Sequence, residues 1–585
     1  GGALVEFNQS NAKAASAFGS QTNLATVLDV ADNQNIIDEY FDWMSGVDVD
    51  DADEDGDTTD IRPDVFGDPL HSKPIVLNYG NNGIYIAVGT NQGALHMFQD
   101  IDPDSKTGDV DEAWAFIPKD FFSNIRPLRE NYSTASKIYG VDGPITSHIV
   151  DYNGNGIVDG ADQAWLFFGL RRGGSSYYAI NVTNPLVPSK MWQIKAGETS
   201  GFSNLGQTWS QPKVAYSKLN ISGSTAKPVL FFGGGYDINK DNSGVGTADN
   251  VGKGIYMVDA ENGTLKWSLT SSQFEDSIPS AIGTLDSDAD GLTDRLYVGD
   301  TGGNVWRVDM PDTDTSKFSL FQLASFGHAT SNEDDRRFFY EPSIVRTFIT
   351  ETIDSGQKNG SGDAIVVKEE IPYDAILIGS GDRVTPLSID TKDVFYMIKD
   401  PNIKTQEFTA SSVPATPTTL TSNDLYNYTN NPFKGLTGVS YDSKAKEVSE
   451  YSGWYFDFEQ SGEKNTASAL VINNVAYFTS FTPPDLTGTP VSCLLPSGQG
   501  WLYAVDLALG TKKYNWEADS RNREDRIAFI SEQFLGAPTL IVTETDDGDP
   551  TTGGADGNII VGRKVIPVGF NLETLRNYLY VDEAQ

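Results

Sequence analysis

The sequence has little of what most enzymes and disulfide-stabilised proteins contain. A single cysteine, Cys493, excludes an internal disulfide, so packing, with metal where it binds, has to stabilise the chain. The four histidines lie far apart without the spacing of a zinc motif, and neither a GxSxG motif nor a phosphate-binding glycine loop is present. We therefore predict no catalytic residues, and a protein that is not an enzyme.

Basic residues are scarce as well. Lysine and arginine total 42 against 81 aspartates and glutamates, which gives a net charge of −39. Nucleic acid and anionic membranes would repel such a chain, whereas cations are its natural small partners. No apolar run approaches the roughly 20 residues that cross a bilayer, so we expect no membrane span. The first residues, GGALVEFNQS, lack the features of a signal peptide, and we expect a mature piece of a longer protein.

Glycine and proline, by contrast, are abundant, at 57 and 27 residues, and most apolar runs are short. Such a composition favours short strands joined by many turns, with little helix. A chain of 585 residues exceeds one ordinary core, so it requires either several domains or a repeat architecture.

A three-part phrase recurs seven times along the chain. A small or polar lead, often proline, opens a strand; an apolar strand usually ending in glycine follows; a third strand alternates apolar and polar residues, as in SIPSAIGTLD, RLYVGD and NVWRVD. The leading prolines lie 63 to 70 residues apart, at Pro74, Pro144, Pro212, Pro279 and Pro342. Period-two alternation between glycine turns predicts one four-stranded antiparallel sheet for each phrase.

Seven such sheets predict an all-β fold, a seven-bladed modified β-propeller closed by pairing between the two chain ends. The spacing nearly doubles after Pro342, which predicts an insertion in the fifth blade at about residues 400–450. We assign the propeller to residues 61–585 and a short helical and linker segment to residues 1–60. Within that segment, residues 35–46 place five apolar side chains on one face of a packing helix: Ile36, Ile37, Tyr40, Phe41 and Met44.

The stretch DSDADGLTD, residues 286–294, has the spacing of a calcium loop. Calcium takes six or more oxygen ligands, which a short loop supplies when alternate side chains point inward around a glycine bend. Four aspartates and one backbone carbonyl fill loop positions 1, 3, 5, 9 and 7 in turn: Asp286, Asp288, Asp290, Asp294 and Leu292. The alternative is a solvated acidic turn, but four like charges in nine residues repel, and an ion removes that cost. This loop is our first choice for Ca²⁺.

Two further loops fit the same template less completely. In DYNGNGIVDGAD, positions 1, 3, 5, 7, 9 and 12 are Asp151, Asn153, Asn155, the Ile157 carbonyl, Asp159 and Asp162. This loop holds three carboxylates rather than four, so we rank it second for calcium. A weaker candidate is DADEDGDTTD, with Asp51, Asp53 and Asp55 but Thr59 at position 9; a disordered acidic linker explains it equally well. The stretch DINKDNSG (237–244) fits the template still less well.

One enzymatic alternative stays open. The stretches GIYMVDAENGTLKW (254–267) and GWLYAVDLALGTKKYNW (500–516) look like blade motifs of pyrroloquinoline-quinone dehydrogenases, which are propellers with calcium beside the cofactor. Those enzymes generally have eight blades, and many stack the quinone on a vicinal disulfide, whereas this chain has seven phrases and one cysteine. Blade packing accounts for the shared motifs without a cofactor.

Several ordered motifs together resemble a known family. They are RPDVFGDPLHSKP (62–74), LFFGGGYD (230–237), GIYMVDAENG (254–263), DSDADGLTDRLYVGDTGGNVWRVD (286–309), GSGDR (379–383) and GWLYAVDL (500–507). From about residue 60 onward, the chain is similar to the carboxy-terminal propeller of the PilY-type tip adhesins and biogenesis factors of bacterial type IV pili.

The resemblance implies a propeller at the pilus tip, outside the cell, reached through the periplasm and outer membrane. There it would assist pilus assembly, oppose retraction, and take part in surface adhesion and twitching motility. The implied partners are minor pilins of the tip, a host-cell or abiotic surface ligand, and an amino-terminal module that is missing here. The family's calcium loop corresponds to residues 286–294, whereas the Arg-Gly-Asp motif of some members is absent. A purely structural scaffold is the remaining alternative.

Overall fold

The structure, a computed structural model, describes most of the chain. The described residues are 2–14, 17–100, 110–131, 136–242, 245–270, 272–327, 331–358, 360–361, 364–484, 497–545 and 554–573. Cys493 lies outside them. The chain forms two compact units, Gly1–Ile282 with Ala289–Thr293, and Gly283–Asp288 with Asp294–Gln585. No helix within the described residues is long and apolar enough to span a membrane.

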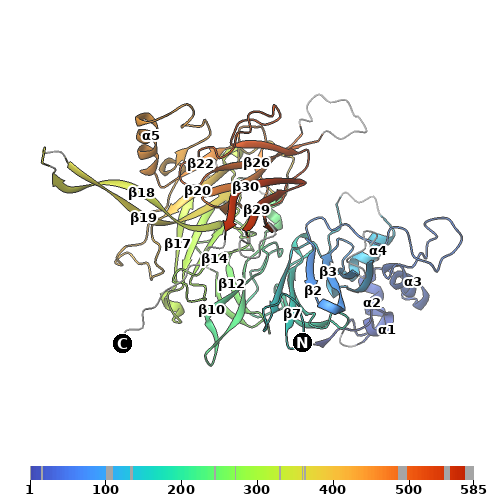
Figure 1. The fold of residues 1–585 in the computed structure, drawn as a ribbon. Coiled ribbons are helices and arrows are strands. Elements are labelled where there is room, and N and C mark those ends of the chain that lie inside the picture. The colour runs from blue at the N-terminus through green and yellow to red at the C-terminus, as the bar shows by residue number, and fades with distance from the viewer. Residues whose placement is uncertain are drawn as a thin grey trace, which may run out of the picture. The chain divides into compact units, whose positions relative to one another are not determined.

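Three antiparallel sheets contain the strands of the first unit (Figure 1). The first runs in chain order through β2 (Ile75–Asn78), β3 (Ile84–Gly89), β4 (Leu95–Asp100) and β5 (Val110–Phe116). The second contains β6 (Ile145–Val150), β7 (Gln163–Gly169), β8 (Ser176–Asn181), β9 (Ser189–Lys195) and, beside β9, β1 (Gly2–Ala3). The third contains β10 (Lys213–Ser222), β11 (Thr225–Gly233), β12 (Ile255–Asp259) and β13 (Leu265–Leu269).

The second unit contains four sheets among its described residues. The first is β14 (Gly283–Leu285), β15 (Arg295–Gly299), β16 (Asn304–Asp309) and β17 (Ser319–Ser325). The next is β18 (Ser343–Lys358), β19 (Ala364–Gly379), β20 (Val394–Asp400), β22 (Gly453–Asp457) and β21 (Tyr426–Asn427). The last two are β23 (Lys464–Asn465), β24 (Leu470–Ile472), β25 (Val475–Thr482), β26 (Gln499–Asp506) and β27 (Ile527–Ser531), and then β28 (Thr539–Thr545), β29 (Gly554–Val561) and β30 (Lys564–Glu573).

The predicted all-β class and the succession of antiparallel sheets are confirmed. In the part of the chain that the structure describes, the strands form seven sheets, as many as the predicted phrases. Pro74, Pro144, Pro212 and Pro342 stand directly before β2, β6, β10 and β18, where the missing N–H of proline costs no ladder bond. The number of blades in a closed ring stays a prediction, since β1 pairs with β9 and residues 574–585 lie outside the described part.

The amphipathic helix predicted at residues 35–46 is α3 (Gln34–Met44). The Asn33 side-chain oxygen caps it by accepting from the backbone N–H of Asn35 at 2.9 Å. Its buried face packs against Leu24 and Phe122. The other helices of this unit are α1 (Gln9–Ala12), α2 (Gln21–Leu28) and α4 (Ile125–Arg129), and all four gather on one side of it (Figure 1). The boundary predicted at residue 60 stays a prediction.

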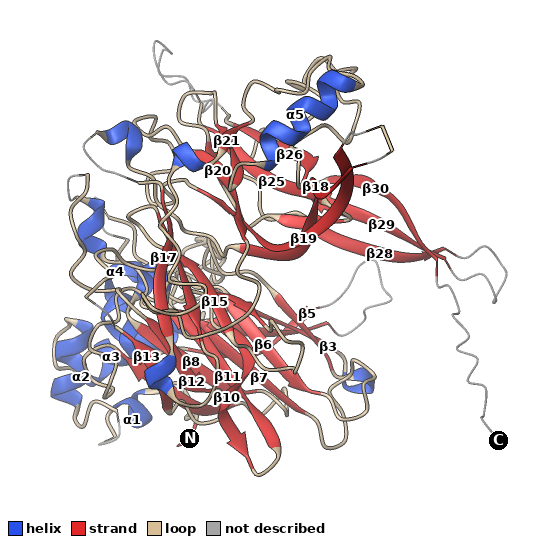
Figure 2. Ribbon diagram, turned by 90° about the vertical axis from the view of Figure 1, so that its left-hand side faces the viewer, coloured by secondary structure: helices blue, strands red, loops and turns tan. Residues whose placement is uncertain are grey.

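The insertion predicted in the fifth sheet is confirmed, because residues 401–452 separate β20 from β22. They include β21, which pairs in parallel with β22, and a helix that the sequence did not predict, α5 (Val439–Ser449; Figure 2). Short 3₁₀ helices occupy other connections: η1 (Gly80–Asn82), η2 (Lys119–Asn124), η3 (Arg171–Gly173), η4 (Ile238–Asp241), η5 (Thr315–Lys317), η6 (Asn332–Asp334) and η7 (Ser422–Asp424).

Paired charges lie within the core of the second unit. Arg307 donates to Asp309 Oδ1 at 2.7 Å and to Asp400 Oδ2 at 2.6 Å. Arg295 donates to Asp374 Oδ2 at 2.6 Å, and all five side chains are fully buried. Burial raises the pKa of the Asp309 carboxyl, and the Arg307 guanidinium opposes that rise. Removing one partner would leave a buried charge uncompensated, which typically costs about 3–5 kcal/mol.

Candidate metal centres

Three acidic loops carry the residues that the sequence singles out for calcium. We name them loop A (51–60), loop B (151–162) and loop C (286–294). Loop B joins β6 to β7 and loop C joins β14 to β15, so each connects the first two strands of a sheet, as the repeat predicts. Loop A precedes β2 and is closed at its base by a β-bridge between Val47 and Ile61.

Loop C gathers three of its four predicted aspartates. Carboxylate oxygens of Asp286, Asp288 and Asp290 lie within 4.8 Å of one another, and the last two side chains are exposed. The bend that gathers them uses left-handed backbone at Ala289, with φ 61°, and at Gly291, with φ 84°. For alanine this conformation costs roughly 1–2 kcal/mol. The resulting group of like charges offers hard oxygen ligands, which is the chemistry that calcium prefers.

The two other predicted ligands of loop C make different contacts. Asp294 is buried, and its two carboxylate oxygens accept from the backbone N–H and the hydroxyl of Ser287, at 3.0 and 2.7 Å. The N–H of Leu292 donates to Asp290 Oδ1 at 2.8 Å. Asp294 therefore holds the start of the loop through its hydrogen bonds with Ser287. Its role as a direct ligand stays a prediction.

Two basic side chains that sequence reasoning missed contact loop C. Lys218 Nζ lies 3.4 Å from Asp290 Oδ2. Arg346 donates to the Ser287 carbonyl at 2.7 Å and to Asp374 Oδ1 at 2.9 Å, which ties the loop's first residues to the buried charges of the second unit. These side chains come from β10 and β18, so no local spacing in the sequence indicates them.

Loop B satisfies its carboxylates with its own amides. The side-chain Nδ2 of Asn153 donates to Asp159 Oδ1 at 3.1 Å, and that of Asn155 donates to Asp159 Oδ2 at 3.0 Å. Asp162 is buried and accepts from the backbone N–H groups of Tyr152 and Asp159, at 2.9 and 3.2 Å. Within loop B the amides thus provide the positive partial charges that an ion would otherwise bring.

Backbone N–H groups donate to further side-chain oxygens of loop B. Asp151 accepts from the N–H groups of Gly154 and Gly156, at 2.6 and 2.8 Å, and the Gly156 N–H is the main cause of its lowered pKa. The Ile157 N–H donates to Asn155 Oδ1 at 2.8 Å. The predicted ligands lie together in one loop, but the direction of the two asparagine amides favours a loop that is stable without metal.

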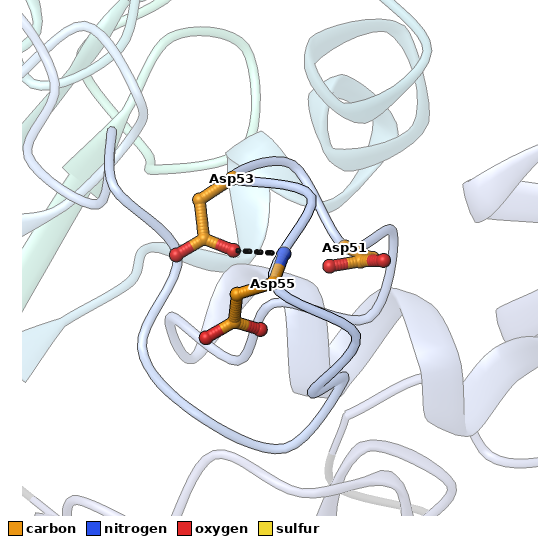
Figure 3. A group of neighbouring side chains, drawn as sticks. All are labelled: Asp51, Asp53 and Asp55. Atoms are coloured by element: carbon orange, nitrogen blue, oxygen red, sulfur yellow. Dashed lines mark hydrogen bonds between the residues drawn. The ribbon is translucent and has the colours of Figure 1, made fainter.

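Loop A, which the sequence ranks below loops B and C, brings three carboxylates together as loop C does. Oxygens of Asp51, Asp53 and Asp55 lie within 4.8 Å of one another, and Asp53 Oδ1 accepts from the Asp55 N–H at 3.3 Å (Figure 3). The pKa of Asp60 is raised, first by burial and then by the negative charges of Asp55, Asp53 and Asp57. Within the described residues, loops A and C are the two places where three carboxylates converge this closely.

Comparison with known families accounts for a large part of the chain. Residues 80–344 match the family model described as the PilY1 beta-propeller domain. We refer to this stretch, which is similar to the PilY1 β-propeller, as the PilY1-type domain. Loops B and C lie inside the PilY1-type domain, whereas loop A precedes it.

Relatives of this PilY1-type domain are named as pilus proteins. The "Type IV pilus biogenesis factor PilY1" of Pseudomonas aeruginosa UCBPP-PA14 is 31% identical over 292 residues, 44% of this chain and 22% of the relative. A "Type IV pilus biogenesis factor PilY1 homolog" of Xylella fastidiosa Temecula1 is 24% identical over 440 residues, 73% of this chain and 26% of the relative. The matched stretches thus span about a quarter of the length of these relatives.

A solved structure shows the same fold. The crystal structure of the Pseudomonas aeruginosa PilY1 C-terminal domain superposes with a TM-score of 0.52 at 18% identity, covering 83% of this chain and 92% of that one. At this identity the likeness establishes the fold alone. It confirms the predicted β-propeller fold.

Proposed function

We propose that this chain is the calcium-binding propeller of a type IV pilus tip protein. It acts as an adhesin and biogenesis factor that supports pilus extension against retraction, surface attachment and twitching motility. The observation that carries the proposal is loop C, whose three converging carboxylates lie inside the region that matches the PilY1 propeller model. The partners are minor pilins of the tip and a surface ligand, and the site of action is outside the cell.

The mechanism is one of binding rather than catalysis. Without an ion, the carboxylates of loop C repel one another, and Lys218 offsets part of that repulsion at Asp290. Calcium held by Asp286, Asp288 and Asp290 would neutralise this repulsion and fix the shape of the loop. Arg346 connects Ser287 of this loop to Asp374 in the buried network, so loop shape and sheet packing depend on each other. The occupied and empty forms then favour different pilus states.

Extracellular calcium sites often have dissociation constants of about 10⁻⁴ to 10⁻³ M. At such affinities, the calcium concentration outside the cell sets the occupancy of loop C. Environmental calcium would thereby act on pilus extension and retraction through this loop.

Calorimetric titration of the 585-residue chain with calcium tests the proposal. Asp290→Ala removes one converging carboxylate and should abolish one binding event, and twitching should fall in cells carrying the same change. Asp442→Ala, at an exposed aspartate of α5, is the matched control and should bind as the parent does. Unchanged stoichiometry and heat in Asp290→Ala would refute the site.

The two alternative functions give different results in the same preparations. A quinone oxidoreductase would change the absorbance of pyrroloquinoline quinone added together with calcium. A purely structural scaffold would keep its melting temperature and its effect on twitching after chelation of calcium. The proposed function predicts no cofactor spectrum and a melting temperature that falls on chelation.

A further inference from the structure

A cavity of about 830 Å³ opens in the first unit and has no part in the proposed calcium site of loop C. It lies where the β2–β3 turn, the end of β4, loop B and the turn after β8 meet. The lining residues are Tyr79 to Gly83, Tyr85, Gln99, Asp100, Val158 to Gly160, Asp162, and Thr183 to Leu186. Loop B therefore forms one wall of the cavity.

Bonds between two sheets hold the cavity open. The Tyr79 hydroxyl donates to the Val182 carbonyl at 2.5 Å, which fixes the β2–β3 turn to the end of β8. The Val158 N–H donates to the Asn78 carbonyl at 2.8 Å, which fixes loop B to β2. Both bonds are made by protein groups alone, so the cavity is formed before any ligand enters. Preformed cavities of about 300–1,000 Å³ are the usual size of small-molecule sites.

The polar lining has a consistent chemistry. It contains no lysine, arginine or histidine, which excludes an anionic ligand, and it contains the side-chain amides of Asn81, Asn82, Gln99 and Asn184. Each amide presents donors and an acceptor together, as a ligand with many hydroxyl groups requires. The Asn184 side-chain oxygen accepts from the Leu186 N–H at 3.1 Å, which sets the orientation of this amide at the rim.

The three carboxylates of the lining do not by themselves favour a cation. Both oxygens of Asp159 accept from asparagine amides of loop B, and both oxygens of Asp162 accept from backbone N–H groups. The third carboxylate is Asp100, at the end of β4, and it is partly exposed. The cavity therefore combines one carboxylate acceptor with several amides, which suits hydroxyl groups better than an ammonium group.

An apolar side completes the site. Tyr79 and Tyr85, with ring centroids 5.2 Å apart in an edge-to-face arrangement, are only 3% and 1% exposed, so they support the wall and leave the accessible apolar surface to Leu186. At the rim, Pro185 is buried and Leu186 is 61% exposed. Sugar rings present C–H groups on one side and hydroxyl groups at their edges. Apolar side chains beside amides provide a surface for each.

We propose that this cavity binds a neutral carbohydrate, a mono- to trisaccharide unit, with loop B as one wall. The interpretation of this carbohydrate as the surface ligand of an adhesin rests on the proposed function. The binding itself requires neither loop C nor a pilus. Asn82 and Asn184 contact the hydroxyl groups, and the exposed Leu186 at the rim contacts the ring.

The test uses the 585-residue chain on an array of immobilised neutral and sialylated oligosaccharides, followed by calorimetry with the neutral oligosaccharide that binds best. The double variant Asn82→Ala/Asn184→Ala removes two exposed amides and should bind about tenfold more weakly or worse. Asn35→Ala, at an exposed asparagine of α3, is the matched control and should bind unchanged. Circular dichroism establishes that both variants fold.

A second arm separates sugar from cation. Asp100→Asn keeps one acceptor and loses the charge, so neutral-sugar binding should stay within about threefold. The proposal is overturned if no neutral oligosaccharide binds, if Asn82→Ala/Asn184→Ala binds as the parent does, or if spermidine binds and Asp100→Asn abolishes that binding. Asp290→Ala in loop C should retain the sugar, so a failure of the calcium proposal and a failure of this one are distinguishable.

Discussion

Loops B and C occupy equivalent connections in their sheets, yet they balance their charges differently. Loop C has aspartates at its third and fifth positions, Asp288 and Asp290, which lie close together with Asp286. Loop B has asparagines there, and their Nδ2 groups donate to Asp159. A change from carboxylate to amide at two positions thus converts a cluster of like charges into a loop with internal side-chain hydrogen bonds. The comparison predicts that loop C depends on an ion and that loop B does not.

The largest expected effect comes from making loop C resemble loop B. Asp288→Asn with Asp290→Asn removes two charges and supplies two amide donors. Calcium affinity at loop C should fall by about 100-fold, and the rise in melting temperature on adding calcium should shrink accordingly. Thermal unfolding with and without calcium measures this, with Asp442→Asn as control. An undiminished calcium-dependent rise would mean that these carboxylates are not ligands.

The reverse exchange in loop B should have the next largest effect. Asn153→Asp with Asn155→Asp removes both donors to Asp159 and brings further negative charge beside it. Without calcium, the melting temperature should fall by about 2 °C or more; with calcium it should recover, and affinity at loop B should rise about tenfold. Asn35→Asp is the control. Equal melting temperatures for parent and variant in chelator would show that the two asparagine amides do not stabilise loop B.

A smaller effect is expected from the lysine beside loop C. Lys218 Nζ lies 3.4 Å from Asp290 Oδ2 and competes with an ion for that carboxylate. Lys218→Met should therefore tighten calcium binding by about two- to fivefold, which is the scale of a partly exposed ion pair. Calorimetry measures the change, and Lys227→Met, at an exposed lysine on β11, should leave the affinity as it is. Weaker binding in Lys218→Met would show that the lysine assists the site instead.

The smallest effect concerns the pH dependence of loop A. Because the pKa of Asp60 is raised above 3.8, the folded chain holds this proton more tightly than the unfolded chain. The resulting stability is present below pH 3.8 and is lost as pH rises through the raised pKa. Asp60→Asn should therefore melt slightly above the parent at neutral pH and equally at low pH, as measured from pH 3 to 7. If loop A binds calcium, adding calcium should reduce the difference in melting temperature between Asp60→Asn and the parent at neutral pH.

The sequence predicts the sheets well because their determinants are local. A period of two, a glycine at a strand end and a proline directly before a first strand, as at Pro74 and Pro144, all lie within about ten residues. The 16-residue length of β18 and β19 was not predicted. The two strands pair with each other as far as Lys358 and Ala364, whereas β20 pairs only with Asp374–Gly379 of β19, so the repeated phrase does not extend to their outer parts.

In the candidate sites too, local spacing identified some residues and missed others. Spacing alone identified the aspartates of loop C, and Asp286, Asp288 and Asp290 converge. Spacing did not identify the two hydrogen bonds that Ser287 donates to Asp294. Nor did it identify Lys218, which comes from another sheet. It also ranked loop A below loops B and C, because Thr59 stands at position 9, whereas convergence requires only the first three aspartates and a bend at Gly56, with φ 88°.

The buried charges of the second unit bear on how this acidic protein responds to salt. The buried Arg295 and Arg307, with the partly exposed Arg346, face Asp309, Asp374 and Asp400, so this network is neutral and contributes nothing to the net charge of −39. The surplus negative charge therefore resides in groups outside it, including the exposed aspartates of loops A and C. Dissolved ions screen exposed charges beyond about 8 Å at physiological ionic strength but barely affect buried pairs. Monovalent salt should thus relieve repulsion between the exposed charges while leaving the interior pairs intact.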